Sequence, residues 1–183
     1  MSKPIKLHLG CGTVILKDWV NLDCVKLPGV DIVHDLNVLP LPFEAESVDE
    51  ILCNDVFEHV AYIPLLKDCH RLLVPGGKIH IEVPHFSACN NYVDPTHINM
   101  FSVKTFNFFV SDTYEGKHRG YYFDFSYRSL SHKRLTFNKG LPFFYNYLVD
   151  PIINSSEKLQ YYYEATFLAR IFPAVNIQVT LVK

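Results

Sequence analysis

A short apolar segment that ends in a glycine turn constrains the fold of this chain more than any other feature. Residues 5–9 run into the tripeptide Gly10-Cys11-Gly12. Glycines at the carboxyl end of a strand allow a ligand to approach the backbone closely. Asp23 follows at the end of a second apolar segment, where an acid can bind the two hydroxyl groups of a ribose. This pattern predicts a nucleoside-cofactor site in an α/β domain, although Asp23 could instead fix a turn.

The first half of the chain has the pattern of strands and crossovers that is typical of a parallel sheet. Strands are expected at residues 5–9, 20–23, 31–35, 48–53 and 79–83, and a helix at residues 56–73. Residues 13–18 alone separate the glycine turn from the second strand, which is too short for a full crossover helix. We therefore expect a loop or a single turn there, with an abbreviated first helix.

The second half of the chain is rich in Phe and Tyr and has weak periodicity. A strand is expected at residues 131–137, a helix at 157–172 and a final strand at 175–182. The predicted fold class is α/β, with a doubly wound, Rossmann-like, mostly parallel sheet of about seven strands and an aromatic-rich insertion after strand five. No linker divides the chain, so residues 1–183 are predicted to form one domain. It comprises a cofactor half (about 1–85), an acceptor or lid half (about 86–172) and a final strand (about 174–183).

Charge and cysteine content argue against several classes of protein. The formal net charge is −2 and no long run of Lys or Arg is present, so no nucleic-acid partner is expected. The 5 cysteines are scattered, without a C-x-x-C pair, which argues against a disulfide framework or a structural zinc site. Neither a signal peptide nor an apolar run near twenty residues is visible. These features predict a cytoplasmic protein without a membrane span.

The glycine turn differs from a dinucleotide-binding fingerprint. That fingerprint, G-x-G-x-x-G, has a third glycine, whereas this chain has Ile15 at the corresponding position. Its acid also comes sooner than the roughly twenty residues expected. The pattern therefore favours a smaller nucleoside ligand over NAD and makes a nicotinamide oxidoreductase a weak alternative.

Several motifs together resemble the class I S-adenosylmethionine-dependent methyltransferases. They occur in the order of that family within residues 5–85, at 8–12, at Asp23, at 35–36, at 47–60 and at 71–77. The chain looks closest to small bacterial-type methyltransferases associated with polysaccharide biosynthesis, which it also resembles at residues 19–23, 94–97 and 172–174. That subfamily often has glycine where this chain has Asp18.

The resemblance implies that the cofactor is S-adenosylmethionine and the product S-adenosylhomocysteine. It also implies that the glycine turn holds the methionine end, Asp23 the ribose, and Asp35 with Leu36 the adenine. Asp35 could alternatively be a turn acid, and Glu58 with His59 could merely cap and pack a helix. The expected cofactor-binding residues are Leu9, Gly10, Cys11, Gly12, Asp23, Cys24, Asp35, Leu36, Asn54, Asp55 and His59.

Two histidines are candidates for a catalytic base. His97 lies in the family-like segment 94–97, and His85 lies at the end of the fifth strand. A hydroxyl acceptor loses a proton during methyl transfer, and histidine titrates near neutral pH; an amine acceptor would need no strong base. No metal site is expected, because His80, His85, Asp94 and His97 fit no standard ligand spacing.

The sequence therefore predicts an S-adenosylmethionine-dependent methyltransferase that acts at oxygen on a small or carbohydrate-linked acceptor. The alternative is a non-catalytic S-adenosylmethionine-binding protein that serves as a regulatory or complex partner. The aromatic segments 120–125, 143–147 and 161–163 are expected to stack on a sugar or another flat acceptor, or to belong to the core, a lid over the acceptor or a homodimer contact.

Overall fold

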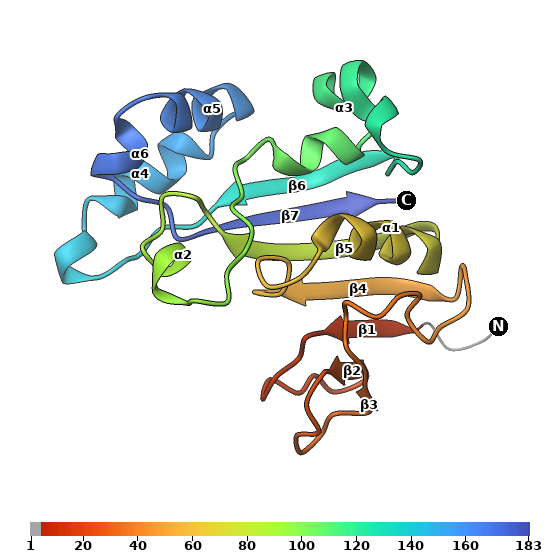
Figure 1. The fold of residues 1–183 in the computed structure, drawn as a ribbon. Helices are drawn as coiled ribbons and strands as arrows, with labels where there is room; N and C mark the ends of the chain where they lie inside the picture. The colour runs from red at the N-terminus through yellow and green to blue at the C-terminus, as the bar shows by residue number, and fades with distance from the viewer. Residues whose placement is uncertain (1–4) are drawn as a thin grey trace.

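A single seven-stranded sheet organises the protein in the computed structural model, which describes residues 5–183 (Figure 1). The strand order is β3-β2-β1-β4-β5-β7-β6. β1 to β5 are parallel, and β7 runs antiparallel between β5 and β6. The strands are β1 (Lys6–Leu9), β2 (Val20–Asp23), β3 (Ile32–Val33), β4 (Val48–Asn54), β5 (Leu73–Pro84), β6 (Ser129–Leu135) and β7 (Asn176–Val182). The predicted α/β, Rossmann-like fold is confirmed.

The helices are short, and most of them follow β5 in the chain. The α-helices are α1 (Tyr62–Leu72), α2 (Asn90–Val93), α3 (Tyr114–Arg119), α4 (Asn146–Ile153), α5 (Glu157–Ala165) and α6 (Leu168–Ile171). Three 3-10 helices are η1 (Thr105–Phe109), η2 (Gly120–Tyr122) and η3 (Leu141–Phe143). In the part of the chain that the structure describes, no helix is long and apolar enough to cross a membrane.

The register of the central strands brings their carboxyl ends together. Leu9 of β1 pairs with Leu22 of β2 and with Cys53 of β4. Gly10, Asp23 and Asn54 therefore follow one another along the same edge of the sheet. The strand order reverses between β1 and β4, and ligands of open α/β sheets bind outside the carboxyl ends of the strands at such a point.

The connections in the first half of the protein contain no helix between residues 10 and 61. The expected abbreviated first helix is thus absent, and turns occupy the segment between β1 and β2. Asp18, in that segment, has a φ of 64°. This left-handed conformation suits glycine best. α1 begins at Tyr62 rather than at residue 56, because residues 55–61 form a loop at the sheet edge.

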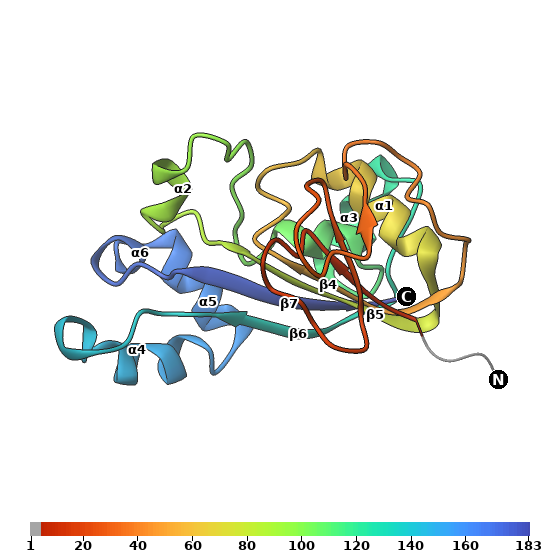
Figure 2. The same ribbon diagram turned by 90° about the horizontal axis from the view of Figure 1, so that it is seen from below.

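One face of the sheet carries the core. α1 and the segment between β5 and β6 lie on this side (Figure 2). Phe101 stacks on Phe106 at 5.6 Å between ring centroids, and both are buried. The hydroxyl of buried Tyr127 donates to the carbonyl of Leu66 in α1 at 3.1 Å. These aromatic residues therefore belong to the core, whereas Tyr121 and Tyr161 are exposed.

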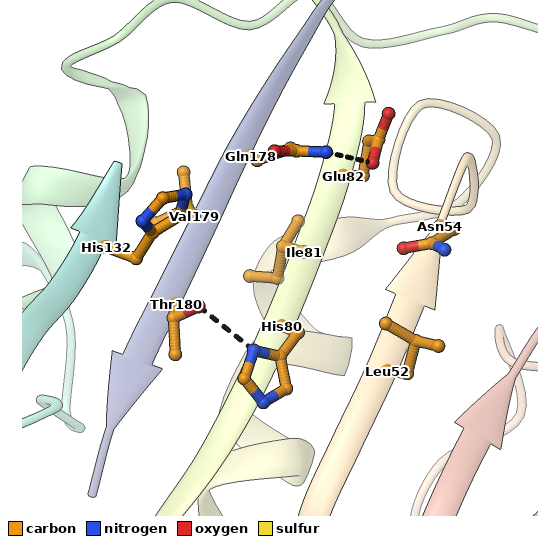
Figure 3. Close-up of a pocket in the computed structure, with 9 residues that line it drawn as sticks. All are labelled: Leu52, Asn54, His80, Ile81, Glu82, His132, Gln178, Val179 and Thr180. Atoms are coloured by element: carbon orange, nitrogen blue, oxygen red, sulfur yellow. Dashed lines mark hydrogen bonds between the residues drawn. The ribbon is translucent and has the colours of Figure 1, made fainter. Parts of the chain in front are cut away.

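The opposite face of the sheet is polar (Figure 3). His80 hydrogen-bonds to Glu50 at 2.9 Å, and Gln178 donates to Glu82 at 2.8 Å. A cavity of about 290 Å³ lies on this face and is lined by Leu52, Asn54, His80, Ile81, Glu82, His132, Gln178, Val179 and Thr180. This cavity lies across the strands, away from the glycine turn.

The predicted helix at residues 157–172 is interrupted. α5 ends at Ala165, Thr166 adopts an extended conformation, and α6 begins at Leu168. Tyr163 accounts for the break, because its hydroxyl donates to the carbonyl of Phe172 at 2.7 Å and accepts from the amide of Ala174 at 2.8 Å. These bonds fold the chain back towards β7.

Candidate active site

The glycine-turn pocket, of about 360 Å³, lies at the carboxyl ends of the first four strands. Its lining combines the glycine turn with acids that follow β2, β3 and β4. The residues are Gly10, Asp23, Cys24, Asp35, Leu36, Asn37, Asp55, Val56, His59 and Val60. The structure thus brings together seven of the residues that the sequence predicts to bind the cofactor.

Both glycines of the turn have left-handed backbones. Gly10 has a φ of +63°, and a Cβ added there would lie 2.5 Å from Cγ2 of Val56. Gly12 has a φ of +50°, but an added Cβ would meet nothing within 4 Å. The turn therefore needs glycine conformationally at both positions, and at Gly10 the missing side chain also leaves room for Val56.

Asp23 is held at the tip of β2 by backbone amides. Its Oδ2 accepts from the amide of Gly12 at 2.7 Å, and its Oδ1 accepts from the amide of Val25 at 3.0 Å. Burial acts to raise the pKa of Asp23, but the backbone hydrogen bonds outweigh it and hold the pKa below the usual value. A carboxylate has about four acceptor sites, and the contacts with Gly12, Val25 and Cys24 leave part of this capacity for a ligand.

Asp35 forms a turn and also lines the pocket. Its Oδ1 accepts from the backbone amide of Asn37 at 2.9 Å, and Oδ1 of Asn37 accepts from the amide of Ala61 at 3.3 Å. The turn after β3 is thereby tied to the loop before α1. Leu36 is buried beside it, while Cys24 is exposed.

The histidine pocket, of about 450 Å³, lies beside the first at the carboxyl ends of β4 and β5. Asp55 and His59 line both pockets. Its lining residues are Asp55, Glu58, His59, Pro84, Asn90, Val93, Asp94, His97, Val175 and Asn176. A molecule in either pocket would face the other across Asp55 and His59.

Asp55 has a strained conformation between the two pockets. Its φ is +51°, which costs a residue with a Cβ about 1–2 kcal/mol, and such strain concentrates at functional sites. Burial is the main cause that raises its pKa, and the charge of Glu82 adds to it. Asp55 is thus a carboxyl group with an elevated pKa at the junction of the pockets.

Two backbone hydrogen bonds bring His97 to the loop before α1. The amides of Ile98 and Asn99 both donate to the carbonyl of Glu58, at 2.8 and 3.3 Å. The ring centroids of His59 and His97 consequently lie 4.7 Å apart, edge to face. One ligand atom from each of Glu58, His59 and His97 lies within 4.8 Å of the others.

Glu58 is a buried carboxyl group without a compensating partner. It is 0 % exposed, and neither carboxylate oxygen has a hydrogen-bond partner among the described residues. Burial is the main cause that raises the pKa of Glu58 to about 7, with further contributions from the charges of Asp55 and Asp94. A buried group of this kind is costly unless something pairs with it.

Asp94 and Thr96 orient the ring of His59. The Thr96 hydroxyl donates to Oδ1 of Asp94 at 2.6 Å and lies 2.8 Å from Nδ1 of His59. Because the hydroxyl proton is used on Asp94, Nδ1 of His59 must be the donor in the other bond. A neutral His59 then carries its lone pair on Nε2.

The other predicted site residues are not in the lining of these pockets. His85 is fully buried, with Nδ1 2.7 Å from Oγ of Ser87 and Nε2 2.8 Å from Oε1 of Glu164. It thereby ties the end of β5 to α5. Leu9 and Cys11 are buried, and Gly12 contributes its amide to Asp23. Asn54 points into the cavity on the polar face of the sheet (Figure 3).

Residues that the sequence did not predict complete both pockets. Val56 and Val60 supply the apolar wall of the glycine-turn pocket. Their spacing fits a helix, which is why the sequence indicated one there. Asn90 and Asn176 line the histidine pocket, and no sequence signal marks them, because they come together only in the folded chain.

Comparison with known proteins agrees with this geometry. Residues 7–81, which span the glycine turn and the first five strands up to Ile81, match the family described as "Methyltransferase domain". This stretch is similar to methyltransferase domains and makes up less than half of the chain. S-adenosylmethionine is the methyl donor of the methyltransferases that the chain resembles, as the sequence motifs predicted. An uncharacterized protein of Methanocaldococcus jannaschii is 40% identical over 47 residues, which cover 26% of this chain and 21% of that protein.

Solved methyltransferase structures share the fold of this domain at low sequence identity. An S-adenosylmethionine-dependent methyltransferase from Archaeoglobus fulgidus has a TM-score of 0.60 at 16% identity, covering 98% of this chain and 86% of that one. A possible histamine N-methyltransferase from Thermotoga maritima has a TM-score of 0.57 at 13% identity, covering 100% and 84%. A geranyl diphosphate C-methyltransferase from Streptomyces coelicolor has 0.57 at 10% identity, covering 98% and 69%. Because the latter two proteins are named for different acceptors, the fold leaves the acceptor open.

Proposed function

We propose that this protein transfers the methyl group of S-adenosylmethionine to a hydroxyl group of a small or carbohydrate-linked acceptor. The observation that carries the proposal is the junction of two pockets at Asp55 and His59. Methyl transfer is an in-line displacement, so its main requirement is that donor and acceptor meet at short range. Adjacent pockets with a common wall meet that requirement.

The glycine-turn pocket is the cofactor site of this proposal. Gly10 exposes backbone to the methionine end, and the remaining acceptor capacity of Asp23 takes the ribose hydroxyls. Leu36, Val56 and Val60 supply apolar surface for the adenine, with Asp35 at its edge. S-adenosylhomocysteine, which lacks only the transferred methyl group, fits the same contacts.

The histidine pocket is the acceptor site. Its polar wall of carboxyl, imidazole and amide groups suits a hydroxylated acceptor better than an apolar one. In the transfer, the acceptor oxygen bonds to the methyl carbon as the carbon–sulfur bond breaks. The sulfonium becomes a neutral thioether and the hydroxyl proton is released. Within the pocket, His97 is the proposed acceptor of that proton, whereas His85 has both ring nitrogens occupied.

The experiment that tests the function is binding followed by turnover. We expect S-adenosylmethionine and S-adenosylhomocysteine to bind in calorimetric titration, and NAD not to bind. A screen of sugars, glycosides and small alcohols, followed by mass spectrometry for a 14-dalton gain, then identifies the acceptor. Binding without turnover on any hydroxylated acceptor would favour the non-catalytic alternative, and a folded protein that binds neither nucleoside would refute the cofactor site.

A further inference from the structure

We propose that Glu58, His59 and His97 form a binding site for a divalent transition metal ion of the zinc type, at the boundary between the cofactor and acceptor pockets. The site adds a metal to a domain for which the sequence analysis predicts none. Its existence is independent of the proposed function, while its role in methyl transfer rests on it.

The donor set is the first argument. Two imidazoles and one carboxylate are the ligands of catalytic zinc sites of the His₂Glu type, which keep a further position open for water or substrate. The ligand atoms of the three side chains all lie within 4.8 Å of one another. Around a zinc ion at bond lengths near 2.1 Å, ligand atoms are about 3.3 Å apart, so each pair needs to close by at most about 1.5 Å.

The orphaned carboxylate is the second and independent argument. Glu58 is 0 % exposed, and neither of its oxygens is hydrogen-bonded within the described chain. No ion pair joins it to His59 or His97 within 4.0 Å among the described residues, although both rings are near. A bound cation would supply the missing compensation, because buried charges are normally paired or coordinate metals.

The state of the histidines is the third argument. The Thr96 hydroxyl donates its proton to Asp94, so Nδ1 of His59 must donate to Thr96, and the lone pair of Nε2 is available. Nδ1 of His97 is buried without a partner, and its Nε2 lies 3.9 Å from Oδ2 of Asp94. Metal-binding histidines characteristically have the second ring nitrogen oriented by a carboxylate or another polar group. Asp94 is placed to serve both rings in this way.

The chemistry of the site deepens the proposed reaction. A divalent ion that binds the acceptor hydroxyl stabilises the alkoxide, as zinc lowers the pKa of bound water from 15.7 to about 7. The alkoxide oxygen then forms the bond to the methyl carbon, the carbon–sulfur bond breaks, and the hydroxyl proton passes to solvent. In the metal-bound protein His97 is a ligand of the ion. The ion then activates the acceptor hydroxyl by polarising it, in place of proton uptake by the His97 imidazole.

The test measures Zn²⁺ binding by the chelator-treated full chain, using calorimetry and elemental analysis after dialysis. We expect one Zn²⁺ per chain and at least a tenfold loss of affinity in Glu58→Gln and in His97→Ala. Thr96→Val, which removes the group that orients His59, should weaken binding by about 10- to 100-fold, as is typical of such outer partners. His80→Ala is the matched control, because His80 also lies beside a glutamate, Glu50, but belongs to no cluster of three metal-ligating side chains among the described residues.

Glu58→Gln decides the result if His97→Ala fails to fold. Replacing an unpaired buried carboxylate by its neutral isostere should raise the melting temperature of the metal-free protein while it weakens Zn²⁺ binding. Co²⁺ gives a second readout, since visible absorption bands of a four-coordinate ion should appear in the wild type and disappear in this variant.

The proposal is refuted if the folded wild type binds no Zn²⁺, or if Glu58→Gln and His97→Ala bind it like the wild type. Titration of the zinc-free protein with S-adenosylmethionine separates this failure from failure of the proposed function. Nucleoside binding without zinc binding overturns the metal site alone, and zinc binding without nucleoside binding overturns the methyltransferase function alone.

Discussion

Replacement of Asp23 by Asn tests the assignment of the glycine-turn pocket most directly. The variant keeps the size of the side chain but loses the charge and one of the two carboxylate oxygens. Those oxygens already accept from the amides of Gly12 and Val25. The substituted amide therefore has one oxygen for the backbone and the ligand together, and at least one ribose hydroxyl loses a charged acceptor.

The size of the effect follows from the loss of that bond. Hydrogen bonds to charged groups contribute about 1.5–3 kcal/mol. At about 1.4 kcal/mol per tenfold change, the dissociation constant of S-adenosylmethionine should rise by about 10- to 140-fold. The same rise is expected for S-adenosylhomocysteine, because the two ligands have the same ribose. A rise confined to S-adenosylmethionine would instead indicate attraction between Asp23 and the sulfonium charge.

Calorimetric titration measures both dissociation constants, with urea unfolding as a check that the variant is folded. Asp49→Asn is the matched control, because Oδ2 of Asp49 also accepts a backbone amide, that of Ile5, at 2.8 Å. Asp49 lies near the amino end of β4, away from the pocket, so this variant should bind like the wild type. A folded Asp23→Asn protein whose dissociation constants stay within threefold of the wild type would refute the ribose contact.

Three further predictions concern the stability of the fold. Gly10→Ala should lower the free energy of unfolding by about 2–5 kcal/mol, because the backbone is strained and the new methyl group contacts Val56. Gly12→Ala should lower it by only about 1–2 kcal/mol, because the backbone strain alone applies there. Equal losses for the two variants in urea unfolding would contradict the contact with Val56. Tyr127→Phe should lower it by about 0.5–1.5 kcal/mol, through loss of the bond to the carbonyl of Leu66, and unchanged urea unfolding would argue against that bond. Burial favours a higher pKa of Asp150, but bonds and charges from its basic neighbours hold the pKa below the usual value. As the pH falls, Asp150 therefore takes up a proton in the unfolded state before it does so in the folded state. Its contribution to the free energy of unfolding is present above about pH 3.9 and is lost as the pH falls through the folded pKa. Asp150→Asn should reduce the acid-side slope of the free energy of unfolding against pH, and an unchanged slope would contradict this contribution.

The glycine turn and Asp23 could be predicted from the sequence because their geometry is local to adjacent strands. A strand that ends at Gly10 and a neighbour that ends at Asp23 must meet at one edge once the strands are parallel. The five leading strands followed from the same reasoning. The first residue of α1 could not be predicted in this way. Val56 and Val60 have helical spacing, but they lie in a loop and line the glycine-turn pocket.

The cluster of Glu58, His59 and His97 could not be predicted, because its members lie in two loops that no local pattern pairs. The pairing becomes visible only in the folded chain, where the amides of Ile98 and Asn99 donate to the carbonyl of Glu58. The placement of His85 was open to prediction: Val83 points into the core, and a residue two positions further along a strand faces the same way.

Loops in place of crossover helices give the centre of this sheet an uneven sensitivity to substitution. Parallel strands that are covered on both faces consist of nearly continuous apolar residues. In β5 the buried Ile79, Ile81 and Val83 instead alternate with the partly exposed His80 and Glu82. In a saturation mutagenesis library selected for folded protein, tolerance along β5 should therefore rise and fall at every second residue. Engineering of this domain can accordingly use outward positions in its central strands, which a three-layer α/β protein keeps inside its core.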